Sequence, residues 1–452
     1  MDDANALTGT YGWLLPQRPV TSLEAYIDGG GGRAWDRARN TEPDEIIVTV
    51  ADAGLRGRGG GGFPTGDKWR SVRDASEETA SAPHLVINGA EGEPGTAKDR
   101  LLLGNNPFQV LEGALVARHA VGADTVHIGV KAASGLAPSL RQAVDEIVAA
   151  GWSQPDSIEV VDGPDEYLFG EETALLEVLE GNLPLPRWLP PYQQGLHRST
   201  GQQHPTVVNN VETLANVPVI LTRGVDGYRA VGTADSPGTI LCTVIGDVAA
   251  PGVYELPMGT PLRQLLVDVA GARDVKLVCN GAASPVLGSD ELDVPLTYED
   301  LRAAGSALGS AGFIVYNDRH CAVRIAITLS HFLAIESCGQ CTACKLGCAA
   351  ITDLLRTLDD GAATRATLVA LTDRLPGITD QVRCALPNGE QLLVGSMLER
   401  FADEFAAHLE HPCPSSLVEP VPKIVALDDT TGEVRLDTEY HRKRADWSYA
   451  PA

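Results

Sequence analysis

Positive charge and long apolar runs are scarce in this 452-residue sequence, which carries 35 Lys and Arg against 60 Asp and Glu. A net charge of −25 argues against nucleic-acid binding and against docking on anionic lipid. No run approaches the roughly 18 apolar residues of a membrane helix, since Arg324 and His331 interrupt the most apolar region, 322–335. The first residues also lack the basic region and apolar core of a signal peptide. The sequence therefore predicts no direct membrane insertion.

Disulfide frameworks and internal repeats are also missing. Most of the nine cysteines fall in one group, which favours a reducing cytoplasm over a secreted, disulfide-stapled protein. The hydrophobic share of 44% is ordinary for a globular protein. The length allows two to four domains with a sizeable core.

Three cysteines, Cys338, Cys341 and Cys344, recur at every third position. This spacing lets one loop direct three thiolates at one iron–sulfur cube, and a [4Fe–4S] cluster needs four. Cys348 and Cys384 are both candidates for the fourth. Two other interpretations are buried apolar or disulfide-bonded cysteines and a zinc site, although zinc usually takes two separated pairs of ligands.

A glycine-rich stretch, residues 54–69, follows a helix predicted to begin near Pro43. Its amides can form an anion nest, and Arg56, Arg58 and Lys68 add positive charge to an otherwise acidic chain. A flexible linker is the alternative, but linkers favour Ser over Arg and Trp. A G-x-G-x-x-G pattern is present, but it follows a helix instead of a strand and so fails the context test for a dinucleotide fingerprint.

The next region alternates strands and helices, which predicts a parallel, doubly wound sheet. The predicted strands are 84–88, 125–130 and 157–161, and the predicted helices are 106–120, 138–150 and 171–180. Ligands of such sheets lie beyond the carboxyl ends of the strands, where residues 88–95 fall. Residues 170–173 and 209–213 present polar groups at the starts of two helices. Helix capping and turn formation would also explain each of these polar groups.

The sequence predicts the fold class α/β, then α+β, then all-α. The predicted domains are 1–235 with an irregular arm over 1–40, a small α+β domain 236–323, a helical domain 324–411 and an extension 412–452. The lone cysteines Cys242 and Cys279 are expected in the core of the second domain. Its predicted elements are strands 239–248, 251–255 and 275–279 and helix 260–269. The helices predicted for the third domain are 324–335, 346–358, 366–375 and 391–409. The extension contains a hairpin-like turn within 423–436 and a basic patch, 441–444, expected on the solvated surface.

Seven motifs in order make the stretch 43–411 similar to a known family. They are Gly54-Leu55-Arg56-Gly57-Arg58-Gly59-Gly60, Gly62-Phe63-Pro64-Thr65-Gly66, Glu91-Gly92-Glu93-Pro94-Gly95-Thr96, Gly170-Glu171-Glu172-Thr173-Ala174-Leu175, Val208-Asn209-Asn210-Val211-Glu212-Thr213, Glu336-Ser337-Cys338-Gly339-Gln340-Cys341-Thr342 and Cys384-Ala385-Leu386. The chain resembles the NADH-oxidising flavoprotein of respiratory complex I, known as its F subunit, and the relatives of that protein in NAD-linked hydrogenases and formate dehydrogenases.

The resemblance implies a Rossmann-like FMN domain, a ubiquitin-like β-grasp domain and a C-terminal helical bundle with a [4Fe–4S] cluster. It implies a diaphorase-type enzyme that exchanges hydride between NAD(H) and FMN and passes single electrons to the cluster. The expected partners are a thioredoxin-like [2Fe–2S] subunit and a larger iron–sulfur or catalytic subunit. The expected location is the cytoplasm, and a peripheral place on the inner membrane through partner subunits is compatible with it.

Carried onto this sequence, the resemblance also implies site residues. Glu93 is the candidate catalytic residue and, with Phe63, an NADH contact. The cofactor-binding candidates are Gly57, Arg58, Gly59, Gly60, Phe63, Lys68, Asn88, Glu91, Glu93, Gly170, Glu171, Glu172, Tyr192, Asn209, Asn210 and Thr213. The implied cluster ligands are Cys338, Cys341, Cys344 and Cys384, which decides against Cys348.

Several positions depart from the family pattern. Ala90 stands for Asp, Ser71 for the second of two adenine-stacking Phe residues, and Leu189 for Lys, while Tyr192 replaces Phe. Asp165-Glu166 replaces a small pair. Flavin binding is expected to survive, and nicotinamide binding to be altered. Two further hypotheses follow: an electron-wiring or assembly subunit with a decayed nicotinamide site, and a flavin site serving a ferredoxin- or flavodoxin-type carrier. The host complex is not encoded in these motifs.

Overall fold

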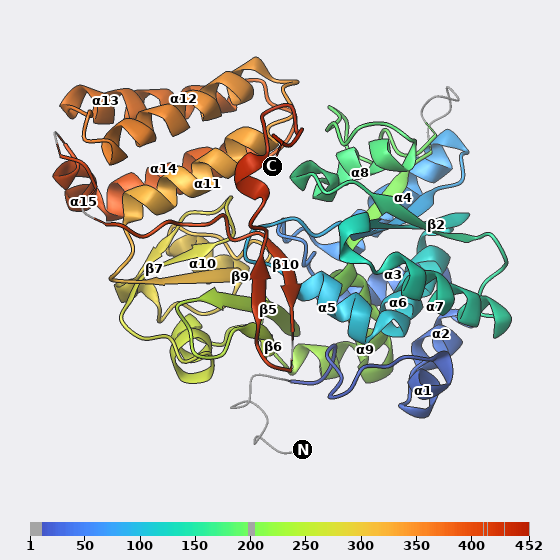
Figure 1. Ribbon diagram of the computed structural model, residues 1–452. Helices are drawn as coiled ribbons and strands as arrows, with labels where there is room; N and C mark the ends of the chain where they lie inside the picture. Colours follow the sequence, from blue (N-terminus) through green and yellow to red (C-terminus); the bar gives the residue numbers. More distant parts are fainter. Residues whose placement is uncertain (1–10, 198–203, 410, 414, 429, 452) are drawn as a thin grey trace.

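The computed structural model describes residues 11–197, 204–409, 411–413, 415–428 and 430–451. Figure 1 shows an α/β part in blue to green, a second sheet in yellow-green and a helical part in orange. The C-terminal extension, in red, runs between these parts.

A four-stranded parallel sheet organises the first part, in the order β3-β2-β1-β4. Its strands are β1 (His84–Gly89), β2 (Thr125–Lys131), β3 (Ile158–Gly163) and β4 (Thr206–Asn210). The central strand aligns Leu85 with Val126 on one side and with Val207 on the other. The prediction of a parallel sheet in an α/β region is confirmed, and β4 is a strand that the sequence pattern does not reveal.

Helices cover both faces of this sheet. They are α1 (Leu23–Asp28), α2 (Arg33–Ala38), α3 (Pro43–Asp52), α4 (Thr65–Thr79), α5 (Lys98–Asn105), α6 (Pro107–Val121), α7 (Ala137–Ala149), α8 (Glu172–Leu179) and α9 (Val211–Arg229). Ile87 belongs to the large core that includes α6 and α9, whereas Val86 and Val208 pack with Leu175 of α8. This alternation is the period of two expected of a strand buried on both faces.

Two sequence predictions for this part are wrong. The predicted irregular arm over residues 1–40 instead contains α1 and α2, and Ser22 caps α1 by accepting a hydrogen bond from the Ala25 amide at 3.2 Å. The glycine-rich stretch, predicted to reach Trp69, ends at Pro64, and α4 begins at Thr65. These helices are stabilised by contact with neighbouring helices, which the sequence does not display.

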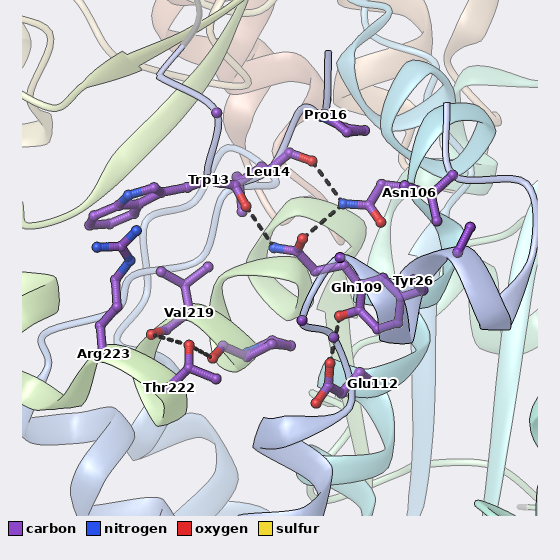
Figure 2. Close-up of a pocket in the computed structure, with 17 residues that line it drawn as sticks. Trp13, Leu14, Pro16, Tyr26, Asn106, Gln109, Glu112, Val219, Thr222 and Arg223 are labelled. Carbon is purple, nitrogen blue, oxygen red and sulfur yellow. Dashed lines mark hydrogen bonds between the residues drawn. The ribbon is translucent and has the colours of Figure 1, made fainter. Parts of the chain in front are cut away.

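The N-terminal segment is fixed to α6 by buried polar side chains (Figure 2). Gln109 donates to the Trp13 carbonyl at 3.0 Å, and Asn106 donates to the Leu14 carbonyl at 3.1 Å. The Glu112 carboxylate accepts from the Tyr26 hydroxyl and from the Trp35 amide. A cavity of about 370 Å³ lies between this segment and α6 and α9.

A mixed five-stranded sheet of order β6-β5-β9-β7-β8 forms the second part. Its elements are β5 (Thr239–Gly246), β6 (Gly252–Pro257), the π-helical segment Gln264–Val269, β7 (Val275–Asn280), β8 (Leu287–Gly288), α10 (Tyr298–Ala303) and β9 (Gly312–Asn317). Cys242 and Cys279 are fully buried in it, so their expected place in the core is confirmed. The helix predicted from residue 260 is shorter, since Leu262 and Arg263 bond back to residues 294 and 292.

Helices make up the third part: α11 (Ala322–Glu336), α12 (Thr342–Asp359), α13 (Arg365–Arg374), α14 (Leu386–Arg400) and α15 (Ala402–Ala407). The single helix predicted over 391–409 is instead two, broken at Phe401. α11 packs along α12 and α14, so the chain returns repeatedly to the same bundle end.

The extension forms an antiparallel hairpin of β10 (Ile424–Leu427) and β11 (Val434–Leu436). The predicted hairpin is confirmed, although Asp429 of its turn lies outside the described residues. The expected solvated patch at 441–444 is wrong for Lys443, which is 4% exposed. Its ammonium group pairs with the buried Glu336 at 2.8 Å.

Candidate functional site

The glycine-rich loop between α3 and α4 is closed by its own backbone. The Gly57 amide donates to the Phe63 carbonyl at 2.8 Å, and the Thr65 amide donates to the Leu55 carbonyl at 2.9 Å. Gly60 and Gly62 have φ values of 120° and 61°, which L side chains rarely adopt. The loop is therefore an ordered cradle, and the linker interpretation is wrong.

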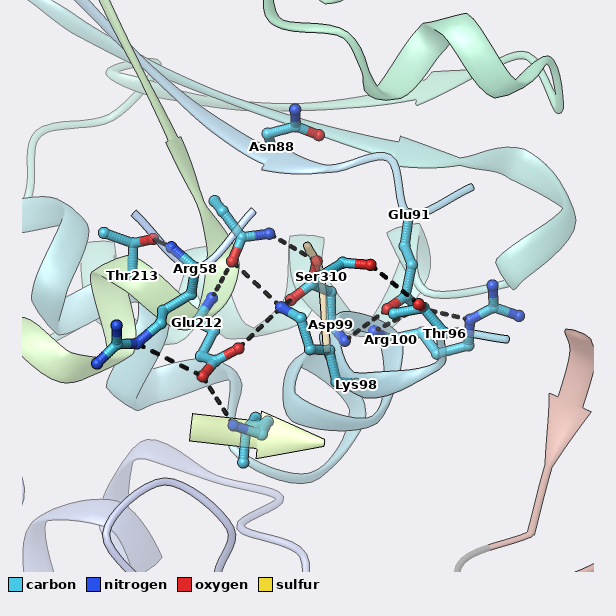
Figure 3. A network of polar contacts seen from close by, with 12 residues as sticks. Arg58, Asn88, Glu91, Thr96, Lys98, Asp99, Arg100, Glu212, Thr213 and Ser310 are labelled. Atoms are coloured by element: carbon cyan, nitrogen blue, oxygen red, sulfur yellow. Dashed lines mark hydrogen bonds and ion pairs between the residues drawn. The ribbon is translucent and has the colours of Figure 1, made fainter. Parts of the chain in front are cut away.

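A buried polar network lies behind this loop (Figure 3). The backbone amide of Arg58 donates to the Thr213 hydroxyl at 2.8 Å, while the Arg58 guanidinium donates to two carbonyls of the second part, at Pro237 and Thr239. The loop is thus fastened on one side to α9 and on the other to β5. The Arg58 side chain is 2% exposed and does not line the cavities described below.

The same network fixes Asn210 at the start of α9. Its Nδ2 donates to Asp99 at 2.6 Å, and its Oδ1 accepts from the Glu212 amide at 2.9 Å. Lys98 bridges Asp99 and Glu212 at 2.7 and 2.8 Å. Burial raises the pKa of Asp99 to about 6, although Lys98 acts against this rise. Of these charged residues only Glu212 stands in a family motif; Lys98 and Asp99 give no signal in the sequence.

The loop borders a cavity of about 460 Å³, here called the first cavity. It collects residues from four separated segments, at the carboxyl ends of the strands. Its predicted cofactor residues are Gly57, Gly59, Phe63, Lys68, Asn88, Gly170, Glu171, Glu172, Tyr192, Asn209, Asn210 and Thr213. The parallel sheet therefore gathers these residues where a doubly wound fold carries its ligands.

A second cavity of about 390 Å³ adjoins the first. The two share Gly59, Asn88, Gly170, Glu171 and Asn210. The second cavity adds the predicted residues Glu91 and Glu93. Gly60, like Arg58, lines neither cavity.

The residues shared by the cavities fit a flat, anionic ligand. An added Cβ on Gly170 would lie 2.9 Å from the Ala90 carbonyl oxygen, and one on Gly59 would lie 3.1 Å from Cβ of Asn210. Asn88 donates to the Gly170 carbonyl at 2.8 Å and holds the two strand ends together. Only glycine keeps the backbone this close to a ligand without a clash.

Charged side chains at the cavities are held in defined positions. Lys68 contacts the Glu172 carboxylate at 2.6 Å and the Val208 carbonyl at 3.0 Å. Glu171 caps α8 by accepting from the amides of Thr173 and Ala174, and burial raises its pKa. Glu91 is fixed by Arg100 at 2.9 Å.

Glu93 lies where the α/β part meets the second sheet. Its carboxylate accepts from the Tyr167 hydroxyl at 2.6 Å and from the Ala282 amide at 2.6 Å. Burial raises the pKa of Glu93, and these two donors act against that rise. Gly281 is required beside it, since a Cβ there would fall 2.2 Å from the Glu93 carboxylate.

The departures from the family pattern have distinct surroundings. Ser71 and Tyr192 line the first cavity together with Phe63, which is 56% exposed. Ala90 lines the second cavity. Asp165 binds Lys423 of the extension, so the acidic replacement serves a contact with a segment outside the resemblance.

Four thiols line a small cavity between α11, α12 and α14. Cys338, Cys341 and Cys344 come from the loop that ends α11 and from the first turn of α12, and Cys384 comes from the segment before α14. Cys348 is fully buried and does not line this cavity. No three of the four sulfurs lie within 4.8 Å of one another in the part of the chain searched, which is wider than the roughly 3.8 Å that a tetrahedral zinc site requires.

The thiols differ in their local electrostatics. A hydrogen bond from Cys348, together with Ser337 and Lys345, lowers the pKa of Cys344 to about 7. Burial raises the pKa of Cys384 to about 12. The second cavity and the cysteine cavity share Leu168, Cys384 and Leu386. The three cavities therefore form a continuous row.

The C-terminal extension clamps the start of the cysteine loop. Glu336, 1% exposed, accepts from the Tyr440 hydroxyl and from Lys443, each at 2.8 Å. Its other oxygen accepts from the Tyr167 amide at 3.0 Å. Trp447 donates to the Ile335 carbonyl at 3.0 Å. The extension is thus part of the wall that positions the cysteines, a role that the sequence does not suggest.

Comparison with known proteins agrees with this arrangement. Residues 50–219 match the model of the Nuo51 FMN-binding domain, and residues 324–408 match that of the NADH-ubiquinone oxidoreductase-F iron-sulfur binding region. The second F subunit of the NADH-quinone oxidoreductase of Rhizobium meliloti is 40% identical over 87% of this chain and 96% of its own length. This chain belongs to the family of NADH-quinone oxidoreductase F subunits.

Another relative in this family comes from a hydrogenase. The NADP-reducing hydrogenase subunit HndC of Solidesulfovibrio fructosivorans is 33% identical over 90% of this chain and 84% of its own length. The crystal structure of an NAD⁺-reducing [NiFe]-hydrogenase in the air-oxidized state matches with a TM-score of 0.77 and 34% identity, over 88% of this chain and 69% of that one. The resemblance stated from the sequence motifs is confirmed. Within the described residues, no helix is long and apolar enough to span a bilayer.

Proposed function

We propose that this chain oxidises NADH at an FMN held in the first and second cavities and passes the electrons singly to a [4Fe–4S] cluster in the cysteine cavity. The continuous row of three cavities is the observation that carries this proposal. Leu168 and Cys384 stand at the boundary between the nucleotide cavities and the cysteine cavity. A two-electron donor and a one-electron acceptor would thus be separated by little more than side chains. The same path serves NAD⁺ reduction when the partner supplies electrons.

FMN, when bound, supplies the chemistry that links two-electron hydride transfer to single-electron release. The task of this chain's residues is to hold and orient the flavin and the nucleotide. The amides of the glycine-rich loop and Lys68 are positioned to bind phosphate oxygens. Displacing Glu172 from Lys68 would free the ammonium group for this contact. Asn88 and Gly170 give the flavin ring a flat wall.

Glu93, Phe63 and Tyr192 are the residues that we assign to NADH. Phe63 and Tyr192 are the aromatic rings that line the first cavity, and adenine stacks on such rings. Hydride transfer moves no proton at the nicotinamide carbon, so we assign Glu93 a contact with the carboxamide group instead of acid–base work. Tyr167 and Ala282 hold its carboxylate in place for that contact.

Cys338, Cys341, Cys344 and Cys384 are the proposed ligands of the cluster. Their common cavity and the wide spacing of their sulfurs fit a cube, whose iron atoms occupy separate corners. Lys345 adds a positive charge close to these thiols, and it donates to the Ser337 carbonyl at 2.6 Å. Positive charge stabilises thiolate ligands.

The finer architecture is part of the same proposal. We assign residues 1–235 to a Rossmann-like domain, 236–323 to a β-grasp domain, 324–411 to a helical bundle and 412–452 to an extension. The separate hydrophobic core of the five-stranded sheet supports the second boundary. The proposed partners are a thioredoxin-like [2Fe–2S] subunit and a larger iron–sulfur subunit, with the assembly facing the cytoplasm.

Anaerobic titration of the purified, cofactor-loaded protein with NADH tests the function. We expect bleaching of the flavin absorbance, a reduced-cluster EPR signal and steady ferricyanide reduction. Tight NADH binding without flavin bleaching would overturn the proposal, and absence of NADH binding would support the wiring hypothesis. Flavin reduction by ferredoxin or flavodoxin, but not by NADH, would identify the third hypothesis as correct.

A further inference from the structure

A second group of metal-binding side chains lies apart from the cysteine cavity. The sulfurs of Cys321 and Cys413 and a ring nitrogen of His408 all lie within 4.8 Å of one another. Within the described residues, this is the one trio of His, Cys, Asp and Glu gathered this closely. Cys321 and Cys338 stand at opposite ends of the 15-residue helix α11, roughly 20 Å apart along its axis. The trio is therefore independent of the proposed cluster.

From these contacts, we propose that Cys321, His408 and Cys413 bind one zinc ion. The sulfur of Cys321 lies 3.4 Å from Nε2 of His408. Neighbouring ligand atoms of a tetrahedral zinc site with two thiolates and an imidazole are roughly 3.5–3.8 Å apart. Only small side-chain movements would thus bring the three ligands around one ion. Soft thiolates with an imidazole are ligands that zinc prefers.

The surroundings orient these ligands. Nδ1 of His408 lies 2.8 Å from the Glu404 carbonyl, and a proton on Nδ1 leaves Nε2 free to bind a metal. Cys321 and His408 are 5% and 3% exposed, whereas Cys413 is only partly buried. The ion can therefore enter from the Cys413 side, where a water molecule would complete the coordination. The charge of Arg324 interacts with both thiols, which favours their thiolate forms.

The site joins three chain segments. Cys321 immediately precedes α11, His408 follows α15, and Cys413 begins the extension. The Cys413 amide also donates to the Asp359 carbonyl, at the end of α12, at 3.0 Å. Figure 1 shows α15 at the outer end of the helical part, away from the α/β part. A bound zinc ion would fix the extension to the bundle before it crosses to the cysteine loop.

Elemental analysis of the full chain, purified anaerobically with its cofactors and exposed to Zn²⁺ and then to a weak chelator, tests the proposal. We expect one zinc per chain besides the cluster iron. Cys413→Ser and His408→Ala should weaken zinc binding at least about 100-fold, because even lost outer-shell partners cost roughly 10–100-fold. Cys279→Ala, which removes a buried cysteine elsewhere, should leave zinc unchanged.

Zinc-edge X-ray absorption shows which site holds the metal, because iron does not contribute to that signal. We expect two sulfur ligands at about 2.3 Å and a nitrogen at about 2.0–2.1 Å. Cys384→Ser should keep this signal, since the cysteine cavity is a separate site. A four-sulfur environment that disappears in Cys384→Ser, absence of zinc, or a Cys321–Cys413 disulfide in the anaerobic protein would each overturn the proposal.

Discussion

The first cavity takes its residues from loops and strand ends that are more than 150 positions apart, from Gly57 to Thr213. The cysteine cavity takes three of its four thiols from the seven residues Cys338 to Cys344. Backbone amides, glycines and paired charges build the first, whereas side-chain sulfur builds the second. A local site can be recognised from spacing alone, because the spacing is itself the ligand geometry. A dispersed site exists only once the sheet has brought its segments together.

The difference also appears in how each site is supported. The nucleotide cavities have a polar network behind them, in which Lys98 joins Asp99 to Glu212. The cysteine loop is held by the extension, through the contact of Lys443 with Glu336. Each site therefore depends on a buried ion pair, but the pair at the cysteine loop comes from a segment outside the family resemblance.

The largest effect is expected at the fourth cluster ligand. Cys384→Ser should remove the cluster, because it takes away the thiol that completes the cavity. Cys348→Ser is the matched control and should keep the cluster, since Cys348 lies outside that cavity. Iron and sulfide content with EPR of the reduced protein measures both. Loss of the signal in Cys348→Ser alone would show that the four thiols come from one local run and would erase part of the contrast above.

The next effect tests the clamp on the cysteine loop. Lys443→Met leaves the Glu336 carboxylate buried without its cationic partner, which should cost about 3–5 kcal/mol of stability. Hydrogen exchange of the α11 and α12 amides should rise accordingly, while the α/β part stays protected. Arg444→Met, at an exposed neighbour, should change stability by no more than about 0.5 kcal/mol. Equal effects of the two variants would mean that the extension does not support the loop.

A smaller gain is expected at the nucleotide end. Ser71→Phe adds a third aromatic ring to the first cavity, which should tighten NADH binding by about 1–3 kcal/mol, or roughly 5- to 150-fold. Isothermal titration with NADH measures the change. Glu78→Phe places the same ring on the exposed side of α4 and should leave affinity unchanged. Weaker binding in Ser71→Phe would show that adenine does not lie beside this helix.

The smallest effect concerns acid sensitivity of the α/β part. Burial, with three neighbouring histidines, lowers the pKa of His84 to about 3. An unfolded histidine titrates near about 6.5, so between about pH 6.5 and 3 the unfolded chain binds more protons and folding stability falls as pH falls. At pH 5 this costs about 2 kcal/mol.

His84→Gln should remove that loss, while the exposed His441→Gln should not. Urea unfolding of each variant at pH 7 and pH 5, followed by hydrogen exchange of β1, measures the difference. If β1 is destabilised equally in both variants at pH 5, His84 is not the group responsible, and the two parts of the molecule do not differ in this respect.

Residue patterns are sufficient for the alternating strands and helices, the helical C-terminal region and the buried Cys242 and Cys279. They fail where tertiary contacts decide the local structure. The sequence of α4 is mostly polar and does not predict a helix, and it is helical because Trp69 and Val72 pack into the core. The short α1 is stabilised by Ser22 and by contact with α6, which the isolated segment does not reveal.

The sequence by itself determined the family, the cofactor types and the three-cysteine loop, because each depends on residue identity at short spacing. Only the tertiary structure decided that Cys384 faces the same cavity as these cysteines, that Arg58 lines neither nucleotide cavity, and that Lys443 is buried against Glu336. These are outcomes of packing between segments far apart in the chain. Side-chain burial and pairing depend on that packing, and no local pattern encodes it.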